Sequence, residues 1–217
     1  MKVNKKDYKI VNPRIPDGLD EICFSDNSIR DEDSFSMSIV SDCDIDNQTA
    51  EQVRFRQMIF RKVDFVDVSF ESIDLTDVRF ENCDLSNVNL SGAIIHRTEF
   101  VNCKILGINL SEASLQNVLF DDCIGGYSSF MFSNLKQVGF RDCILNNADF
   151  QDSKFDKVMF CTSNLQEASM AGTKLNGIDL SDCEIEGIRV KTGDIYGAVV
   201  SPLQAIYFSK LLGLIVK

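Results

Sequence analysis

Eight cysteines and a single histidine are the residues of this 217-residue chain that could support metal or redox chemistry. Zinc sites usually combine closely spaced cysteine pairs with further cysteine or histidine ligands. The chain contains no CxxC pair, and we expect His96 at an exposed position without a ligand or nucleophile beside it. We therefore interpret most of the cysteines as small apolar core residues, with metal or redox chemistry as the alternative. Five of them are spaced by multiples of twenty: Cys83, Cys103, Cys123, Cys143 and Cys183.

Carboxylates are the other abundant reactive groups, with 33 Asp and Glu against 22 Lys and Arg, and they give a formal net charge of −11. Binding to nucleic-acid phosphates requires a surplus of Lys and Arg, so the charge predicts no direct nucleic-acid binding and favours a basic protein partner. The sequence has no GxGxxG, P-loop, GxSxG or HExxH motif, and we expect neither an enzyme nor a metal or cofactor. It also has no signal-peptide or membrane-spanning apolar run, which favours a cytoplasmic location away from membranes.

A five-residue period organises most of the chain. Every fifth residue from Phe55 to Val200 is large and apolar at 29 of 30 positions, with Gly125 as the exception, and the position two residues earlier is mostly small or β-branched. This period matches neither the 3.6 residues of a helix nor the 2.0 of a strand, so the chain must turn once per unit. Repeated turns in one sense produce coils that pair in parallel about 4.8 Å apart, which describes a solenoid.

A longer period of twenty residues fixes the number of units in each coil at four. Ser163 fills the gap in the cysteine series, and a phenylalanine series has the same spacing. We therefore predict ladders of identical side chains stacked along the solenoid axis. The phenylalanine series is Phe60, Phe80, Phe100, Phe120, Phe140 and Phe160.

Individual units carry a recognisable motif. The segments Cys83-Asp-Leu-Ser-Asn, Ala148-Asp-Phe-Gln-Asp and Ile178-Asp-Leu-Ser-Asp resemble the A(D/N)LXX units of the pentapeptide-repeat family. The resemblance covers about two thirds of the chain. It implies an all-β fold, namely a right-handed quadrilateral parallel β-helix. The carboxyl-terminal sequence further predicts a short helix at the end of this solenoid.

Three segments follow from where the period holds. We expect an irregular amino-terminal cap over 1–33, the solenoid over 34–200, and a helix followed by a short strand over 201–217. Ser201, Pro202 and Gly213 are boundary signals for this helix. The segment has more apolar residues than one coil end can cover, which predicts a homodimer, with a monomeric cap as the alternative. The expected interface residues are Leu203, Ile206, Phe208, Leu211, Leu212, Leu214, Ile215 and Val216.

Outward acidic residues gather on or beside the face that carries the cysteine series, and they predict an acidic stripe for partner binding. Plain solubility is the alternative explanation. About eight coils give a rod of about 40 Å, and a dimer twice that long has about half the charge of B-DNA of equal length. The predicted stripe consists of Asp64, Asp67, Glu81, Asp84, Asp121, Asp122, Asp142, Asp182 and Glu184.

The carboxyl-terminal run SPLQAIYFSKLLGLIVK is similar to the end of the Qnr quinolone-resistance proteins, particularly their loop-free Gram-positive type. The resemblance implies a dimeric DNA mimic that binds type II topoisomerases, chiefly DNA gyrase but also topoisomerase IV, and protects them from fluoroquinolones. Gram-negative Qnr proteins carry loops that contribute to protection, whereas the repeat here is unbroken, so inhibition of gyrase without protection is a further expectation. A scaffold for an unrelated protein is the competing hypothesis.

Two smaller features remain. Cys161 lies at an outward position and is the expected reactive thiol. The Gly125-Gly126 pair interrupts the inward series beside outward Tyr127, Met131 and Phe132, which indicates either a partner contact or a local packing adjustment.

Overall fold

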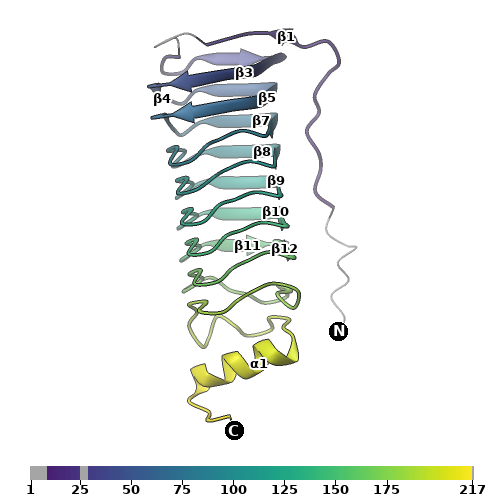
Figure 1. Ribbon diagram of the computed structural model, residues 1–217, viewed down its shortest axis with the longest axis vertical. Helices are drawn as coiled ribbons and strands as arrows, with labels where there is room; N and C mark the ends of the chain where they lie inside the picture. Colours follow the sequence, from purple (N-terminus) through teal and green to yellow (C-terminus); the bar gives the residue numbers. More distant parts are fainter. Residues whose placement is uncertain (1–8, 25–28, 217) are drawn as a thin grey trace.

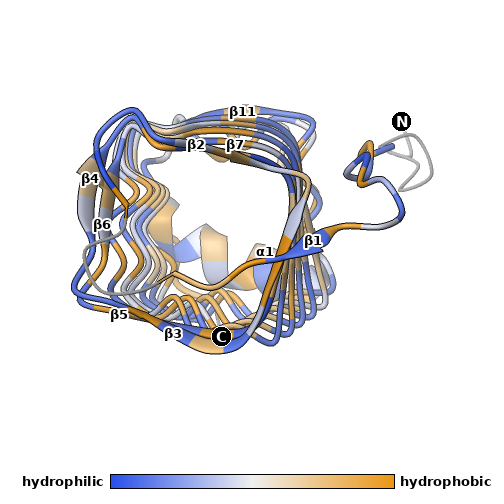
Figure 2. Ribbon diagram, turned by 90° about the horizontal axis from the view of Figure 1, so that it is seen from above, coloured by the Kyte–Doolittle hydropathy of each residue, from blue (hydrophilic) through white to orange (hydrophobic). Residues whose placement is uncertain are grey.

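The chain forms a four-sided parallel β-solenoid of about seven turns with one short helix at its carboxyl-terminal end (Figure 1). A computed structural model describes residues 9–24 and 29–216. The view along the axis shows the stacked coils as the four sides of a closed outline (Figure 2). The predicted fold class is confirmed, with about one turn fewer than we expected from the length of the repeat.

Parallel strands twenty residues apart build two adjoining sides of the solenoid. Phe60 pairs with Phe80, Phe80 with Phe100 and Phe100 with Phe120, and isolated bridges continue the same register on the other two sides. The main sheet has the order β1-β3-β5-β7-β8-β9-β10-β11, with β2 paired to β5 and β12 to β10, and β4 pairs separately with β6. The strands are β1 (Asp20–Glu21), β2 (Ser34–Ser36), β3 (Ser38–Asp46), β4 (Thr49–Glu51), β5 (Arg54–Val66), β6 (Ser69–Glu71), β7 (Asp74–Glu81), β8 (Ile94–Val101), β9 (Ser114–Asp121), β10 (Asn134–Arg141), β11 (Lys154–Asp156) and β12 (Met159–Cys161).

The core consists of the two inward positions of each unit. Successive rings from Phe60 to Phe160 stack with centroids 4.7 to 5.1 Å apart and planes within 9° of parallel. Phe130 and Phe150 form a second stack of two rings, 4.8 Å apart, that meets the first edge to face. The predicted phenylalanine ladder is confirmed, and offset or edge contacts of this kind add to the burial of the rings.

Each corner of a coil requires a residue in the left-handed region of backbone space. In one coil the four corners are Asn82, Asn87, Gly92 and Arg97, with φ between 47° and 69°. Gly and Asn tolerate this region better than residues with large side chains. The frequent Asn, Asp and Gly at these positions therefore let the chain turn every five residues.

Gly125 leaves no void in the core. A Cβ atom built on it would lie 2.9 Å from Ile105 Cγ1 and 3.1 Å from Leu145 Cδ2, so the neighbouring coils already fill the space. The coil also keeps its register, because the Gly125 N–H donates to Ile144 O at 2.7 Å. Of the two interpretations of the break, the structure supports local packing for Gly125 itself.

The amino-terminal segment does more than cover the coil end. Phe24 and Ile29 are buried over the first coil, and the Phe24 ring meets Phe35 edge to face at 4.9 Å. Residues 9–17, which we call the N-terminal arm, instead run down the outside of the solenoid across several coils (Figure 1). The described residues of the segment 1–33 thus include the N-terminal arm, which lies along one corner of the rod and not over the coil end.

The carboxyl-terminal end is closed by helix α1 (Pro202–Ser209), followed by the 3-10 turn η2 (Lys210–Leu212). Ser201 and Gln204 form a reciprocal capping box at its start, and the buried Gln204 amide donates to Leu180 O and Cys183 O, both at 2.8 Å. The bond to Cys183 O takes the place of the backbone bond that the following coil makes elsewhere, as from the Lys104 N–H to Cys83 O. The strand expected after Gly213 is not formed: in this single chain the described residues 214–216 pair with no strand.

Candidate functional site

The cysteine face is the side of the solenoid whose inward residues are Cys83, Cys103, Cys123 and Cys143, all buried. Each thiol points into the core, and Cys123 Sγ donates to Phe100 O at 3.4 Å, as Cys143 Sγ does to Phe120 O. Ser163 occupies the next position and makes the same bond to Phe140 O at 3.4 Å. The thiols therefore act as packed, hydrogen-bonded core groups.

The pKa values of most of the buried thiols agree with an inert core role, whereas the hydrogen bond with the Cys103 thiol lowers the pKa of Cys83. The hydrogen bond with the Cys103 thiol, together with burial, raises the pKa of Cys123 to about 12, and burial raises that of Cys183 to about 12. A high pKa removes the thiolate that metal binding and redox chemistry require. Among the described residues, no three His, Cys, Asp or Glu side chains lie together as a metal site would need.

Two further cysteines lie nearer the surface. Cys161, the expected reactive thiol, is only half-buried and lines a cleft of about 260 Å³ with Ile10 of the N-terminal arm. Cys23 is exposed, and burial together with Cys23 raises the pKa of its neighbour Cys43 to about 11. The sequence pattern missed Cys23 because it lies before the repeat becomes regular.

The outer surface of the cysteine face changes its chemistry along the rod. Its central ladder, joined by parallel bridges, begins with two aspartates, continues with a lysine and two isoleucines, and ends with an asparagine and a glutamate. The acidic stripe is therefore interrupted at mid-length by apolar residues as well as by Lys104. The ladder is Asp64, Asp84, Lys104, Ile124, Ile144, Asn164 and Glu184.

Three of the nine predicted acidic residues form ion pairs within the chain. Glu81 contacts Arg61 Nε at 2.7 Å and Arg79 Nε at 2.8 Å. Asp84 contacts Lys104 Nζ at 3.2 Å, and Asp121 contacts Arg141. The hydrogen bond and charge of Arg141 hold the pKa of Asp121 below its usual range. These pairs reduce the charge available to a partner.

The other six predicted acidic residues differ in their contacts. Asp64, Asp67, Asp122 and Asp142 are exposed and form no ion pair with any described cation. Glu184 is exposed and accepts a hydrogen bond from Asn164 at 3.0 Å. Asp182 accepts from the Cys183 thiol at 3.7 Å. A hollow of about 300 Å³ lined by Asp64, Asp67 and Asp84 is wide enough for a cationic side chain.

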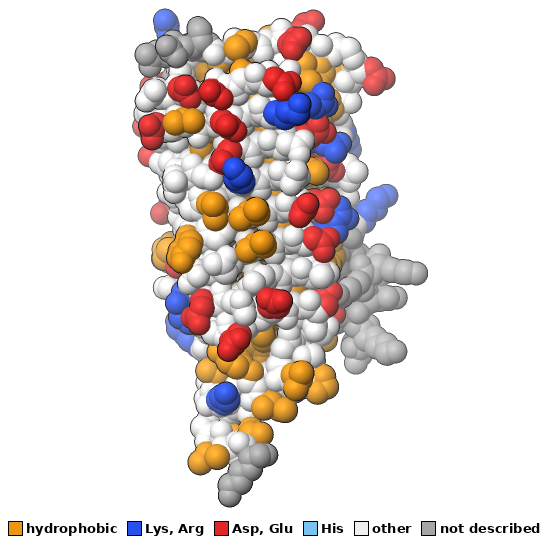
Figure 3. All heavy atoms as spheres, in the orientation of Figure 1, with side chains coloured by type: hydrophobic (Ala, Val, Ile, Leu, Met, Phe, Trp, Pro, Cys, Tyr) orange, Lys and Arg blue, Asp and Glu red, His pale blue; other side chains and the backbone are white. Residues whose placement is uncertain are grey.

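An apolar patch, which we call the apolar belt, lies at mid-length on the face shown in Figure 3, with acidic side chains above and below it. It starts on the cysteine face, passes over the corner at Tyr127 and continues on the next face to Phe132. The sequence pointed to Tyr127, Met131 and Phe132 but not to the isoleucines beside them, because each isoleucine seemed an isolated outward residue until the coils were stacked. We define the belt as Leu106, Ile124, Tyr127, Met131, Phe132 and Ile144, of which all but the half-buried Met131 are exposed.

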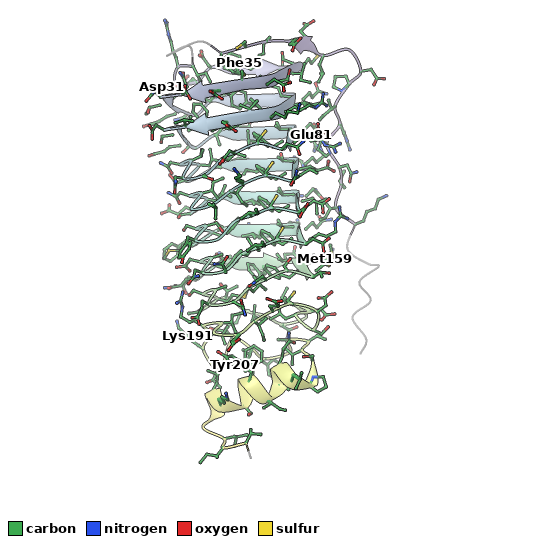
Figure 4. The ribbon with its side chains drawn as sticks, in the orientation of Figure 1. Asp31, Phe35, Glu81, Met159, Lys191 and Tyr207 are labelled. Carbon is green, nitrogen blue, oxygen red and sulfur yellow. The ribbon has the colours of Figure 1, made fainter. Side chains whose placement is uncertain are left out.

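The N-terminal arm occupies the corner diagonally opposite Tyr127, which we call the arm corner. Asn117 Oδ1 accepts from the Val11 N–H at 3.2 Å and Asp77 Oδ1 from the Arg14 N–H at 2.9 Å. Met159 and Glu81, labelled in Figure 4, lie on the side along which the arm runs. The cysteine face and the belt are thus left open. The arm corner consists of Gln57, Asp77, Arg97, Asn117 and Gln137.

Arg97 and His96, at the arm corner, make contacts within the chain. Arg97 forms a two-pronged ion pair with Asp77, with Nε–Oδ1 2.6 Å and Nη2–Oδ2 2.7 Å. His96 is half-buried beside this pair, not fully exposed as expected, and burial together with the Arg97 charge lowers its pKa. Neither residue lies near the acidic face.

The predicted dimer residues divide into two groups. Phe208 is buried against the last coil, where it holds α1 to the solenoid, so the chain does not present it as free surface. The side chain of Leu212 lies outside the described part of the chain. The others are exposed, with Leu203 at 80% and Ile215 at 88%: Leu203, Ile206, Leu211, Leu214, Ile215 and Val216.

Solved structures of low sequence identity resemble the chain. HetL, a pentapeptide repeat protein involved in heterocyst differentiation regulation from the cyanobacterium Nostoc sp. strain PCC 7120, has 16% identity and a TM-score of 0.38 over 78% of this chain and 90% of HetL. Full-length QnrB1, a plasmid-mediated fluoroquinolone resistance protein, has 16% identity and a TM-score of 0.36 over 83% and 100%. A pentapeptide repeat protein from the Arabidopsis thaliana thylakoid lumen has 20% identity and a TM-score of 0.32 over 59% and 75%.

Comparison of the sequence with curated proteins gives no significant match. Two family profiles do match it: a pentapeptide repeat region over residues 73–150 and pentapeptide repeats in eight copies over residues 143–182. Solenoids of this kind are generally structural or binding scaffolds. The two profiles together span 73–182, just over half of the chain, and the stacked coils follow the same unit, so this chain belongs to the pentapeptide-repeat family.

Proposed function

We propose that this chain is a non-catalytic binding protein that docks its cysteine face on a basic protein surface, and that the partner is a type II topoisomerase such as DNA gyrase. The observation that carries the proposal is the position of four exposed aspartates along one open side of the rod, none of which forms an ion pair with a described cation: Asp64, Asp67, Asp122 and Asp142. Such a rod is steered electrostatically toward a positively charged DNA-binding saddle. The similarity of the carboxyl-terminal run to Qnr proteins is what directs the proposal to topoisomerases.

Dimerisation through the carboxyl-terminal segment is part of the proposal. Large apolar side chains of α1 and of 214–216 are exposed close together in the chain, and exposed apolar patches mark interaction surfaces. Residues 214–216 have backbone groups that a second copy could pair across a two-fold axis. A dimer would double the length of the rod and bring two cysteine faces to one partner.

A cytoplasmic location, where topoisomerases act on DNA, belongs to the same proposal. The only related observation concerns the described helices, neither of which is long and apolar enough to cross a membrane.

Competition with DNA tests the proposal. Purified gyrase would be immobilised and the binding of the full chain measured with and without a long DNA duplex. The proposal predicts saturable binding that duplex DNA displaces and that weakens as salt is raised. Absence of binding at low salt, or binding that excess duplex leaves unchanged, would refute occupancy of the DNA-binding saddle.

A second candidate function is a scaffold for an unrelated basic protein. The apolar belt favours it, because the outside of a DNA duplex offers a partner no apolar patch of this kind. In the same assay, this candidate predicts no competition by duplex DNA.

A further inference from the structure

The apolar belt contains two aromatic residues in the left-handed backbone conformation that the corners of the solenoid adopt. Tyr127 and Phe132 both have φ of 59°, and they form two successive corners of one coil. Among the described residues with positive φ they are the only aromatic ones, and most of the others are Asn, Asp, Gln, Gly or charged. A large side chain in this region costs about 1–2 kcal/mol relative to glycine.

Burial within the chain does not offset that cost. Tyr127 is 69% exposed and Phe132 is 55% exposed. An exposed aromatic side chain that also strains the backbone contributes little to folding. A contiguous exposed apolar patch marks an interaction surface.

The belt is framed by carboxylates that have no described cationic partner. Asp122 and Asp142 each precede a belt isoleucine by two residues on the cysteine face. At the other end, Glu112 and Asp152 occupy the same corner as Phe132 in the coils before and after it, about 4.8 Å away along the axis. An apolar patch with negative charge at both ends complements an apolar group with positive charge on both sides.

We propose that the apolar belt is a docking site for an extended basic protein segment in which one or two large apolar side chains lie between lysines or arginines. The apolar side chains pack against Tyr127, Phe132 and the isoleucines, and the flanking cations meet Asp122, Asp142, Glu112 and Asp152. This inference rests on the proposed function only in so far as the chain binds a basic protein. It adds an apolar anchor that charge mimicry of DNA does not supply.

Two peptides provide the test. One fluorescein-labelled peptide carries a Trp and a Leu between lysines, and the other has Ser at both of these positions. We expect the full chain to bind the first at least about tenfold more tightly, since burial of one large apolar side chain changes affinity by that order. Binding would be followed by fluorescence anisotropy.

The key variant is Tyr127→Asn combined with Phe132→Asn. Asn is the residue that other corners carry, so this variant relieves backbone strain and is expected to fold at least as well as the wild type. It should bind both peptides equally. Tyr196→Asn is the matched control, because Tyr196 is 80% exposed but lies away from the belt, and it should keep the tenfold preference. Asp122→Asn combined with Asp142→Asn should weaken the binding of both peptides and reduce the salt dependence of their affinities.

Two results would overturn the inference: a wild-type chain that does not distinguish the peptides, or a Tyr127/Phe132 variant that keeps the preference. Gyrase binding is read out separately. A chain that prefers the apolar peptide but ignores gyrase retains the docking site and loses the topoisomerase proposal. A chain that binds gyrase but shows no peptide preference retains the topoisomerase proposal and loses the docking site.

Discussion

Replacement of Gly125 by leucine is expected to destabilise the protein, although the repeat pattern favours a large apolar residue there. From the pattern alone, a leucine would bury its side chain and add about 1.5–3 kcal/mol to the free energy of unfolding. The structure reverses the sign. The new Cβ would meet Ile105 Cγ1 at 2.9 Å, Ile105 Cδ1 at 3.0 Å and Leu145 Cδ2 at 3.1 Å before the rest of the side chain is placed.

Overpacking of this kind costs about 1–3 kcal/mol, so we expect the free energy of unfolding to fall by that amount. Urea unfolding followed by circular dichroism measures it. Gly193→Leu is the control, because a Cβ there meets nothing within 4 Å and its φ is not in the left-handed region. The control should change stability by less than about 0.5 kcal/mol.

A double variant makes the test specific to the contact. Ile105→Ala alone should leave a cavity and cost about 2–5 kcal/mol. In the presence of Gly125→Leu the new side chain fills that space, so the two changes together should cost at least about 1 kcal/mol less than their sum. If Gly125→Leu unfolds at the same urea concentration as the wild type, or at a higher one, the neighbouring coils do not fill the space at Gly125 as we describe.

Three further predictions concern the thiols, the arm corner and the carboxyl terminus. At pH 8, Cys123, with a pKa of about 12, is almost wholly protonated. Iodoacetamide should therefore label exposed Cys23 first and leave Cys103 and Cys123 unmodified until denaturant is added. Early labelling of Cys103 or Cys123, detected by mass spectrometry, would contradict the core role of these thiols. At the arm corner, burial alone would raise the pKa of Asp77, but the hydrogen bonds from Arg97 and the Arg14 N–H hold it below its usual range. The stability that Asp77 adds is therefore complete above about pH 4 and is lost as pH falls through the lower folded pKa. The difference in the free energy of urea unfolding between the wild type and Asp77→Asn should then shrink below pH 4. A difference that grows below pH 4 would contradict this prediction. Finally, Leu203→Asp with Ile215→Asp should convert a dimer to a monomer by light scattering, whereas Val11→Asp, on the arm, should not, and a wild-type chain that is already monomeric removes the proposed interface.

The periodic part of the fold follows from the sequence because each unit has two inward residues and a fixed length. A period of five that groups into twenty leaves the stacked phenylalanines and thiols almost no other arrangement. The same logic misplaced Phe208, since the helix it lies on has no repeat to indicate which side faces the coil. The N-terminal arm was also missed. Its hydrogen bonds join Arg14 to Asp77, residues far apart in sequence, and no local pattern signals them.

The candidate site was less predictable than the fold. Outward residues could be assigned to a face, but their pairing depends on the lateral geometry of side chains one coil apart. Lys62, Lys104 and Arg141 could be assigned to the same face as the acidic stripe. The ion pairs of Glu81 with Arg61 and of Asp121 with Arg141 could not be assigned in this way. The belt emerged only when Ile124 and Ile144 were stacked next to Tyr127. Position in the repeat therefore indicates which residues are exposed but not which of them remain uncompensated.

The central claim is that uncompensated carboxylates on the cysteine face bind a topoisomerase, and a gyrase supercoiling assay with and without ciprofloxacin tests it most directly. The key variant is Asp122→Lys with Asp142→Lys, and the matched control is Asp121→Asn with Arg141→Gln, which removes an internal ion pair without changing net charge. We predict that the wild type and the control alter supercoiling or relieve the drug's inhibition to the same extent, and that the key variant does neither. A wild-type chain without effect, or a key variant as active as the wild type, would contradict the account.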